Sequence, residues 1–195
     1  CGVQPEDAET LGRIVMELPG LELEGITVFR TVAFPGAAGR SPDELGREEG
    51  ELLVQLAERL RAAGLPIRTV AGGSTPTARA AATVPDITDV RAGTYVFGDG
   101  LMTAWGAVVP EEIALTVLCT VVSRPLQERA TIDGGSKTFA GDIAVGAVPG
   151  RAGHGRSVDI DGYIEAMNEE HGMVRLGSQR ACAVGAEQPD MRVPA

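Results

Sequence analysis

The chain has 195 residues, enough for one large domain or for parts of two, and its hydrophobic fraction of 44% is normal for a protein with a buried core. Its formal net charge of -10 argues against nucleic acid as a partner, because phosphate backbones are bound by basic surfaces. No apolar run approaches the roughly 18 residues of a membrane helix, and no segment has the pattern of a signal peptide. We therefore expect a cytoplasmic protein with no membrane partner.

Helices and strands are predicted to alternate over residues 1–100. A proline and two acids at 5–7 open a helix whose apolar positions recur at helical spacing up to residue 18. The next helix is opened by the capping box Ser41-Pro42-Asp43-Glu44 and ended by Gly64. Strands are predicted at 25–32, 66–71 and 89–97, with a short alanine-rich helix at 76–82. This alternation indicates parallel βα units.

The pattern changes after Pro110. Residues 113–123 form a long β-branched run, and another strand-like segment follows at 129–133. Glycine, proline and aspartate then interrupt the chain repeatedly, which is typical of short strands joined by turns. We expect a βα domain at residues 1–110 and an antiparallel β-domain at residues 111–195.

The three cysteines, Cys1, Cys119 and Cys182, form no CxxC pair and are odd in number. This spacing argues against a disulfide framework and against a zinc knuckle. We expect buried or incidental thiols.

The most informative local pattern is the segment Gly72-Gly73-Ser74-Thr75-Pro76-Thr77, which follows a predicted strand. We expect Thr75 to be the N-cap of the next helix and Pro76 its first residue. Unpaired N–H groups and the helix dipole would favour an anion there, and the glycines let backbone come close to it. The alternative is an ordinary strand-to-helix turn with a good cap.

A second such loop, Arg91-Ala92-Gly93-Thr94-Tyr95, lies one βα unit downstream. In a parallel barrel both loops would lie on the same face, and barrels frequently hold a phosphate between their last two such loops. The two loops together predict a phosphate site.

Several segments, taken in chain order, resemble successive segments of the D-threonine aldolase and D-serine dehydratase family. They are Cys1-Gly2-Val3-Gln4-Pro5-Glu6-Asp7-Ala8, Gly73-Ser74-Thr75-Pro76-Thr77, Val90-Arg91-Ala92-Gly93-Thr94-Tyr95-Val96-Phe97, Leu115-Thr116-Val117 with Val121-Val122-Ser123-Arg124-Pro125, Asp133-Gly134-Gly135-Ser136-Lys137, and Glu169-Glu170-His171-Gly172. Each motif is weak alone, but six in the right order are specific. The similarity extends to about Gly185.

The resemblance implies an α/β, alanine-racemase-like fold. The chain would form the C-terminal part of a TIM-type (β/α) barrel that carries pyridoxal 5'-phosphate, followed by part of an antiparallel β-domain. It implies that the cofactor phosphate is held by Ser74, Thr75, Gly93, Thr94 and Tyr95.

The position of Arg91 matches that of an arginine near the pyridine nitrogen in alanine racemases. The alternative is an exposed arginine at the end of a strand.

The implied function is that of a pyridoxal-phosphate-dependent lyase acting on D-3-hydroxy amino acids, of the D-threonine aldolase type or the D-serine dehydratase type. A divalent metal, Mn or Zn, and a homodimer of the full-length protein are implied as well. Two alternatives remain open: a non-catalytic pyridoxal-phosphate-binding barrel, and a barrel that binds another phosphorylated metabolite.

The chain departs from the family in the groups that perform catalysis. The family's Schiff-base lysine and metal ligands have no counterparts here, and the first residue, Cys1, and the last, Ala195, are both expected to be cuts through a longer protein. The one lysine, Lys137, falls in the predicted β-domain, where an exposed turn residue is expected. His171 is expected to be structural and His154 to lie in a mobile loop. No catalytic or metal-binding residue is therefore assigned, and the piece itself is expected to be inactive.

Overall fold

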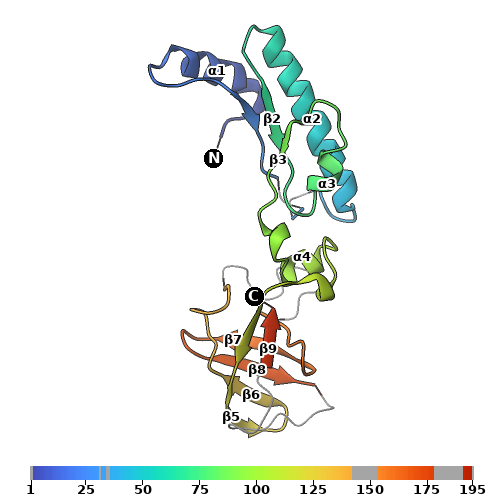
Figure 1. The fold of residues 1–195 in the computed structure, drawn as a ribbon, viewed down its shortest axis with the longest axis vertical. Coiled ribbons are helices and arrows are strands. Elements are labelled where there is room, and N and C mark those ends of the chain that lie inside the picture. The colour runs from blue at the N-terminus through green and yellow to red at the C-terminus, as the bar shows by residue number, and fades with distance from the viewer. Residues whose placement is uncertain (1, 31, 34–35, 142–152, 178–190, 195) are drawn as a thin grey trace. The chain divides into compact units, whose positions relative to one another are not determined.

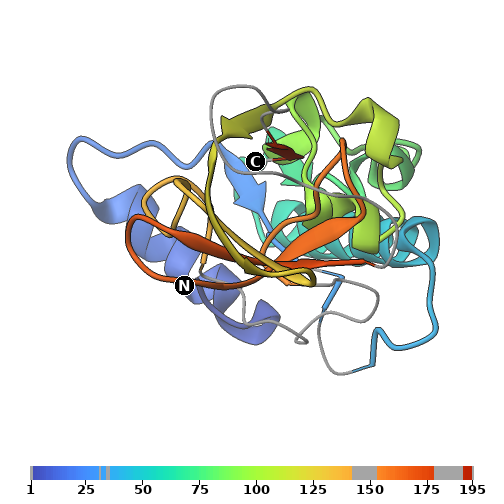
Figure 2. The same cartoon turned by 90° about the horizontal axis from the view of Figure 1, so that it is seen from below.

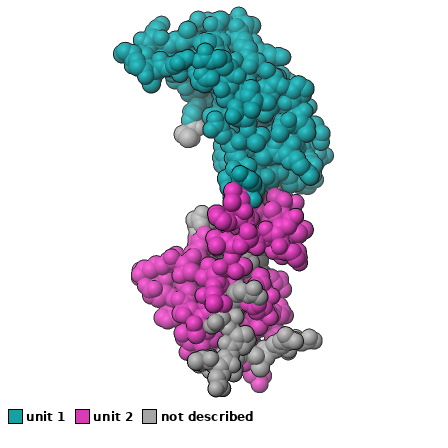
Figure 3. All heavy atoms as spheres, viewed as in Figure 1, with its two compact units in different colours: residues 1–95 teal, residues 96–195 magenta. Residues whose placement is uncertain are grey.

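The computed structural model describes residues 2–30, 32–33, 36–141, 153–177 and 191–194. The chain divides into two compact units, Cys1–Tyr95 and Val96–Ala195, which are coloured separately in Figure 3. Each unit has its own cluster of buried hydrophobic residues. The domain boundary that the sequence predicted after residue 110 stays a prediction.

The first unit contains a three-stranded parallel sheet in the order β1-β2-β3 (Figure 1). The strands are β1 (Gly25–Thr27), β2 (Thr69–Gly72) and β3 (Asp89–Val90). Both pairings are parallel, with Gly25 opposite Thr69 and Gly72 opposite Val90. The predicted parallel βα units are therefore confirmed.

All three strands are shorter than predicted. Before β2, the Leu65 N–H donates to the Leu60 carbonyl, and the Ile67 N–H donates to the Leu65 carbonyl. Residues 65–67 therefore form turns and do not pair with β1. Beyond β3, the predicted strand 89–97 gives way to the 3₁₀-helix η2 (Thr94–Val96).

The helices of this unit follow the local sequence signals closely. A 3₁₀ turn, η1 (Pro5–Asp7), leads into α1 (Ala8–Glu17), and a long helix, α2 (Pro42–Ala62), precedes β2. The Ser41 hydroxyl accepts the Glu44 N–H at 3.2 Å, and the Glu44 carboxylate accepts the Ser41 N–H at 2.8 Å. The predicted capping box is thus confirmed, and Gly64 follows the helix with φ +86°. The last helix, α3 (Ala78–Ala81), has only four residues.

The core of the first unit forms between α2 and the sheet. Its buried members are Leu53, Ala57, Leu60, Leu65, Ile67 and Val70. The three from α2 are spaced at four and three residues, so they lie along one face of the helix. This face holds α2 against the strand that leads into the first predicted phosphate loop.

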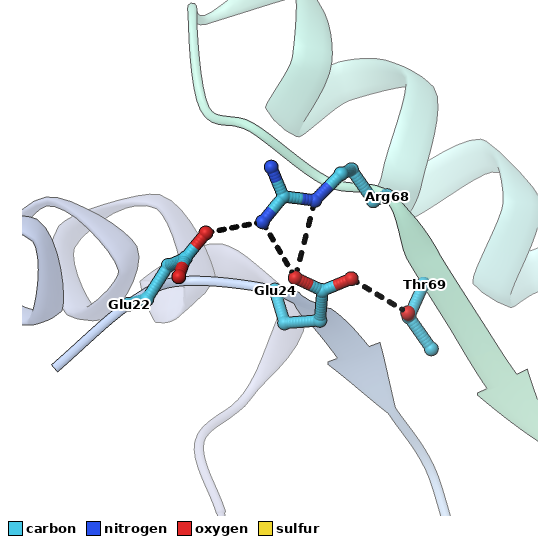
Figure 4. Close-up of polar contacts among 4 residues, drawn as sticks. All are labelled: Glu22, Glu24, Arg68 and Thr69. Carbon is cyan, nitrogen blue, oxygen red and sulfur yellow. Dashed lines mark hydrogen bonds and ion pairs between the residues drawn. The ribbon is translucent and has the colours of Figure 1, made fainter.

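The amino ends of β1 and β2 are tied together by charged side chains, as Figure 4 shows. Arg68 donates to the Glu24 carboxylate through Nε at 3.1 Å and Nη2 at 2.6 Å, and it also pairs with Glu22. The Arg68 guanidinium lowers the pKa of Glu24 below its usual range. Because this cluster is exposed, its stabilising contribution is small. It lies at the end of the sheet opposite to the two predicted phosphate loops.

The second unit is mainly antiparallel β, as predicted. Two short helices come first, α4 (Gly100–Ala104) and the 3₁₀-helix η3 (Pro110–Glu112). A four-stranded sheet has the order β5-β6-β8-β7, and a separate two-stranded sheet pairs β4 with β9. Figure 2 shows the strands of this unit in yellow to red. The strands are β4 (Thr116–Cys119), β5 (Val121–Leu126), β6 (Arg129–Ile132), β7 (Gly162–Met167), β8 (Gly172–Leu176) and β9 (Met191–Pro194).

The β-branched run 113–123 is divided at Thr120 between two strands, β4 and β5. The Asp133 carboxylate accepts the Thr120 N–H at 2.8 Å, and the Thr120 carbonyl accepts the Asp133 N–H at 3.1 Å. Because Thr120 is bound to this residue after β6, the segments on either side join different sheets.

Cys119 lies in the core of the second unit, among residues such as Val121, Ile132 and Ile164. Burial raises the pKa of its thiol to about 11, with a further contribution from the Asp133 carboxylate. The expectation of a buried thiol is confirmed for Cys119, while Cys1 and Cys182 lie outside the described residues.

In the part of the chain that the structure describes, every helix is too short or too polar to cross a membrane.

Candidate functional site

The two predicted phosphate loops leave the same edge of the parallel sheet. Gly72 pairs with Val90 in the β2–β3 ladder, and the Arg91 N–H donates to the Gly72 carbonyl at 3.1 Å. The first loop, residues 72–77, and the second loop, residues 91–95, therefore begin side by side at the carboxyl ends of neighbouring strands. The prediction that they share one face is confirmed.

The first loop is folded tightly on itself. Gly73 has φ +81°, a conformation that favours glycine, and a Cβ at this position would lie 2.9 Å from the Cα of Ala78. The Ser74 carbonyl accepts two N–H groups, from Thr77 at 2.9 Å and from Ala78 at 2.7 Å. These bonds close a turn over residues 74–77 before any helix begins.

The predicted cap at Thr75 was therefore wrong. Helix α3 begins at Ala78, two residues after the proline that was expected to open it, and Thr77 is the residue that precedes the helix. The physical reason is that the Ser74 carbonyl takes up the Thr77 and Ala78 N–H groups, so residues 74–77 form a turn. A helix of one turn also contributes little dipole, which removes that part of the argument for an anion.

Thr77 is the organising side chain of the first loop. It is only 1% exposed, and its Oγ1 accepts the Ser74 N–H at 2.8 Å. The Ser74 hydroxyl, in a residue that is 6% exposed, lies 3.1 Å from the same Oγ1. Ser74 is thus turned into the loop, where it fixes the loop's shape.

Thr75 and Gly93 present the free donors of this edge. Thr75 is half-buried, and within the described part of the chain its N–H meets no acceptor. Gly93 is exposed, and a Cβ built on it would have nothing within 4 Å. Thr94 is half-buried and Tyr95 exposed, and both lie at the start of η2, where helical N–H groups lack partners. This edge therefore offers hydrogen-bond donors and room for an anion to approach them.

The sequence analysis missed Glu49 and Thr77. Glu49 lies on α2, is 3% exposed, and accepts the Gly73 N–H at 2.9 Å through Oε1. A signal existed in the sequence, since Glu49 is four residues from both Leu45 and Leu53, which puts it on the buried face of the helix. Nothing in the sequence indicated that Thr77, rather than Thr75, would hold the loop.

Comparison with known families and structures identifies the chain. Residues 1–100 match the family described as alanine racemase, N-terminal domain, and residues 114–188 match the one described as "Putative serine dehydratase domain". The chain belongs to the alanine racemase N-terminal domain family.

Two curated relatives extend the match of this alanine-racemase-like chain. It is 31% identical to the D-threo-3-hydroxyaspartate dehydratase of Delftia sp. (strain HT23), over 87% of this chain and 52% of the relative. It is 29% identical to a D-threonine aldolase of Arthrobacter sp, over 98% of this chain and 48% of the relative. The chain thus spans about half the length of the curated relatives it matches.

The solved structure of the Delftia dehydratase superposes with a TM-score of 0.80 at 30% identity, over 99% of this chain and 54% of that one. The predicted family resemblance and the alanine-racemase-like α/β fold are confirmed.

The other residues that the sequence analysis considered are Arg91, at the start of the second loop, and Lys137, His171 and His154 in the second unit. Arg91 follows β3 and is exposed. Lys137 is exposed in a turn and pairs with Glu169 and Glu170, as expected for a surface lysine. His171 closes the turn between β7 and β8, where its N–H donates to the Asn168 side chain at 2.8 Å.

His154 donates its N–H to the Ile164 carbonyl at 2.8 Å. In the described residues, no group of three or more His, Cys, Asp or Glu side chains is placed to hold a metal ion.

Proposed function

We propose that this chain is the phosphate-binding part of a pyridoxal-phosphate-dependent lyase that acts on D-3-hydroxy amino acids. The observation that carries the proposal is the pair of loops at the carboxyl ends of β2 and β3, held side by side by the strand pairing and the Arg91–Gly72 bond. Active sites of β/α barrels lie at this end of the strands. The similarity to a D-threo-3-hydroxyaspartate dehydratase and a D-threonine aldolase supports the substrate class.

The residues of the two loops fit a phosphate group. A phosphate has several acceptor oxygens and needs N–H and O–H donors at close range. The free N–H of Thr75 and the open space at Gly93 meet these requirements. We propose that Ser74, Thr75, Gly93, Thr94 and Tyr95 hold the cofactor phosphate, with Ser74 acting mainly through the shape of the first loop.

The task of this chain is to bind and orient the cofactor. When bound, pyridoxal phosphate supplies an electron sink for the bond that breaks at the amino acid's Cα. Anchoring the phosphate on two loops would fix the distance of the cofactor from the carboxyl ends of the strands. The buried Ser74 and Thr77 hydroxyls keep the first loop in one conformation, so little freedom is lost on binding.

The groups that move protons and break bonds are not assigned to this chain. Lys137 is committed to surface ion pairs in the β-rich unit and is unsuited to hold the cofactor covalently. The described side chains do not fit the divalent metal that the family resemblance implies, and we derive no step through it. The homodimer and the cytoplasmic location stay proposals for the full-length protein.

Turnover by the full-length protein tests the proposal. With D-threonine, an aldolase releases glycine and acetaldehyde, whereas a dehydratase releases 2-oxobutanoate and ammonia. We expect the protein to acquire the visible absorbance of bound pyridoxal phosphate and to convert D-threonine, D-serine or D-threo-3-hydroxyaspartate, leaving L-threonine untouched. Absorbance without turnover would support a non-catalytic cofactor carrier and contradict the lyase. Binding of other phosphorylated compounds without any affinity for pyridoxal phosphate would contradict both.

A further inference from the structure

Buried polar side chains in the described residues are concentrated beside the first loop. Four buried residues are polar or charged, and three of them, Glu49, Ser74 and Thr77, form one cluster. Carboxylates are almost never fully buried unless they are paired. Glu49 therefore needs a specific reason to point inward from α2.

Glu49 is bound to the first loop through both of its oxygens. Oε1 accepts the Gly73 N–H at 2.9 Å, and Oε2 lies 3.4 Å from the Thr77 hydroxyl, which can donate to it. The same Thr77 oxygen accepts the Ser74 N–H. One side chain thus controls three of the loop's residues, directly at Gly73 and Thr77 and through Thr77 at Ser74.

The helix is built to bring Glu49 close. A Cβ at Gly46 would lie 2.5 Å from the Thr77 carbonyl oxygen, and a Cβ at Gly50 would lie 2.8 Å from the Val84 side chain. Glycine at these two positions lets the backbone of α2 approach the loop and α3. The Gly73 conformation, at φ +81°, turns the N–H of that residue toward the carboxylate.

We propose that Glu49 is a positioning residue, which holds the first loop in the conformation that receives the cofactor phosphate. This inference rests on the proposed function. Glu49 itself is buried behind the loop and donates nothing to the phosphate. Its role is to occupy the N–H of Gly73 and the hydroxyl of Thr77, so that the N–H of Thr75 is the one left facing outward.

The charge of Glu49 is compatible with an anion nearby. Burial raises the pKa of Glu49, while the Gly73 N–H, the Arg30 charge and the Thr77 hydroxyl act in the opposite direction. A carboxyl with a raised pKa is more readily neutral and repels a phosphate less. The hydrogen bond from Gly73 is kept in either protonation state.

The test separates phosphate binding from binding of the cofactor's ring. Pyridoxine 5'-phosphate and pyridoxine are titrated into the full-length protein by calorimetry, and the ratio of their affinities measures the contribution of the phosphate. The variants are Glu49→Leu, which removes both acceptors, and Glu49→Gln, which keeps an acceptor for Gly73. The matched control is Glu51→Leu, since Glu51 is exposed on the same helix and has the same charge.

We expect Glu49→Leu to lower the affinity ratio at least about tenfold, as the loss of an ordering hydrogen bond to a charged group predicts. Glu49→Gln should restore most of it, and Glu51→Leu should leave it unchanged. If Glu49→Leu keeps the parent's ratio, the positioning role is wrong although the phosphate site stands. If the parent shows no preference for the phosphorylated compound, the proposed function fails and this inference fails with it.

A second pair of variants, at Thr77, tests the same proposal if Glu49→Leu does not fold. Thr77→Val preserves the volume of the side chain but removes the hydroxyl that links Glu49 to Ser74. We expect it to lower the affinity ratio, and Thr77→Ser to restore it. Equal ratios for Thr77→Val and Thr77→Ser would overturn the proposal.

Discussion

Replacement of Gly73 by alanine tests the geometry of the first loop most sharply. The new methyl group would meet the Ala78 Cα at 2.9 Å in a backbone conformation of φ +81°. A left-handed conformation costs an L-residue roughly 1–2 kcal/mol. Crowding against backbone that cannot move freely adds roughly 1–3 kcal/mol. We therefore expect Gly73→Ala to lower the free energy of unfolding by about 2–5 kcal/mol.

Gly64 provides the matched control, because its φ of +86° is similar but a Cβ there would have nothing within 4 Å. Gly64→Ala should show the conformational cost alone, about 1–2 kcal/mol. Both variants are measured by urea unfolding followed by circular dichroism, and midpoints are compared at equal m-values. A loss in Gly73→Ala no larger than that in Gly64→Ala would refute the close approach of Gly73 to α3.

Three further predictions concern the second loop, the buried carboxylate and the buried thiol. Gly93→Val should change the free energy of unfolding by less than about 0.5 kcal/mol, because Gly93 is exposed in open space. It should nevertheless weaken the binding of pyridoxine 5'-phosphate at least about tenfold. Gly100 is equally open, and Gly100→Val should leave this binding unchanged. Because burial raises the pKa of Glu49 in the folded state, the parent loses stability as the pH rises through that pKa, whereas Glu49→Gln carries no such charge. The free energy of unfolding of Glu49→Gln, relative to that of the parent, should therefore be higher at about pH 8 than at about pH 5. The same difference at both pH values would contradict the raised pKa. With the other two cysteines replaced by serine, Cys119 should react with Ellman's reagent only after unfolding, since its pKa of about 11 and its burial leave almost no accessible thiolate; rapid labelling of the folded protein would contradict this.

The elements that the sequence predicted well are those governed by neighbouring residues. The capping box at Ser41 and Glu44 and the glycine end of α2 act within one turn of helix, so the sequence shows them directly. The parallel arrangement of β1, β2 and β3 likewise follows from the alternation of helices and strands along the chain.

The elements that the sequence could not predict depend on residues far apart in the chain. The division between β4 and β5 at Thr120 is stabilised by Asp133, thirteen residues later, and no residue within the β-branched run indicates it. In the first loop, Thr75 and Thr77 are both plausible caps by residue type. Thr77 precedes the helix because the Ser74 carbonyl accepts the N–H groups of Thr77 and Ala78. The Thr77 hydroxyl is also within reach of Glu49, which is 28 residues before it in the chain.

The candidate site shows the same division. Loops at the carboxyl ends of β2 and β3 were predictable, because the order of elements places them there. The buried support under the first loop was not, although the spacing of Leu45, Glu49 and Leu53 places a carboxylate on the apolar face of α2. A charge at such a position is the sequence signal most worth following in related chains.

The central claim is that the two loops hold the phosphate of pyridoxal phosphate, and a crystal structure of the full-length protein with this cofactor tests it directly. We predict that the phosphate lies between the loops, within hydrogen-bond distance of the Thr75 N–H and of the turn at Gly93, with the Glu49–Gly73 bond intact behind it. A cofactor whose phosphate is bound elsewhere, with both loops unoccupied, would contradict the account.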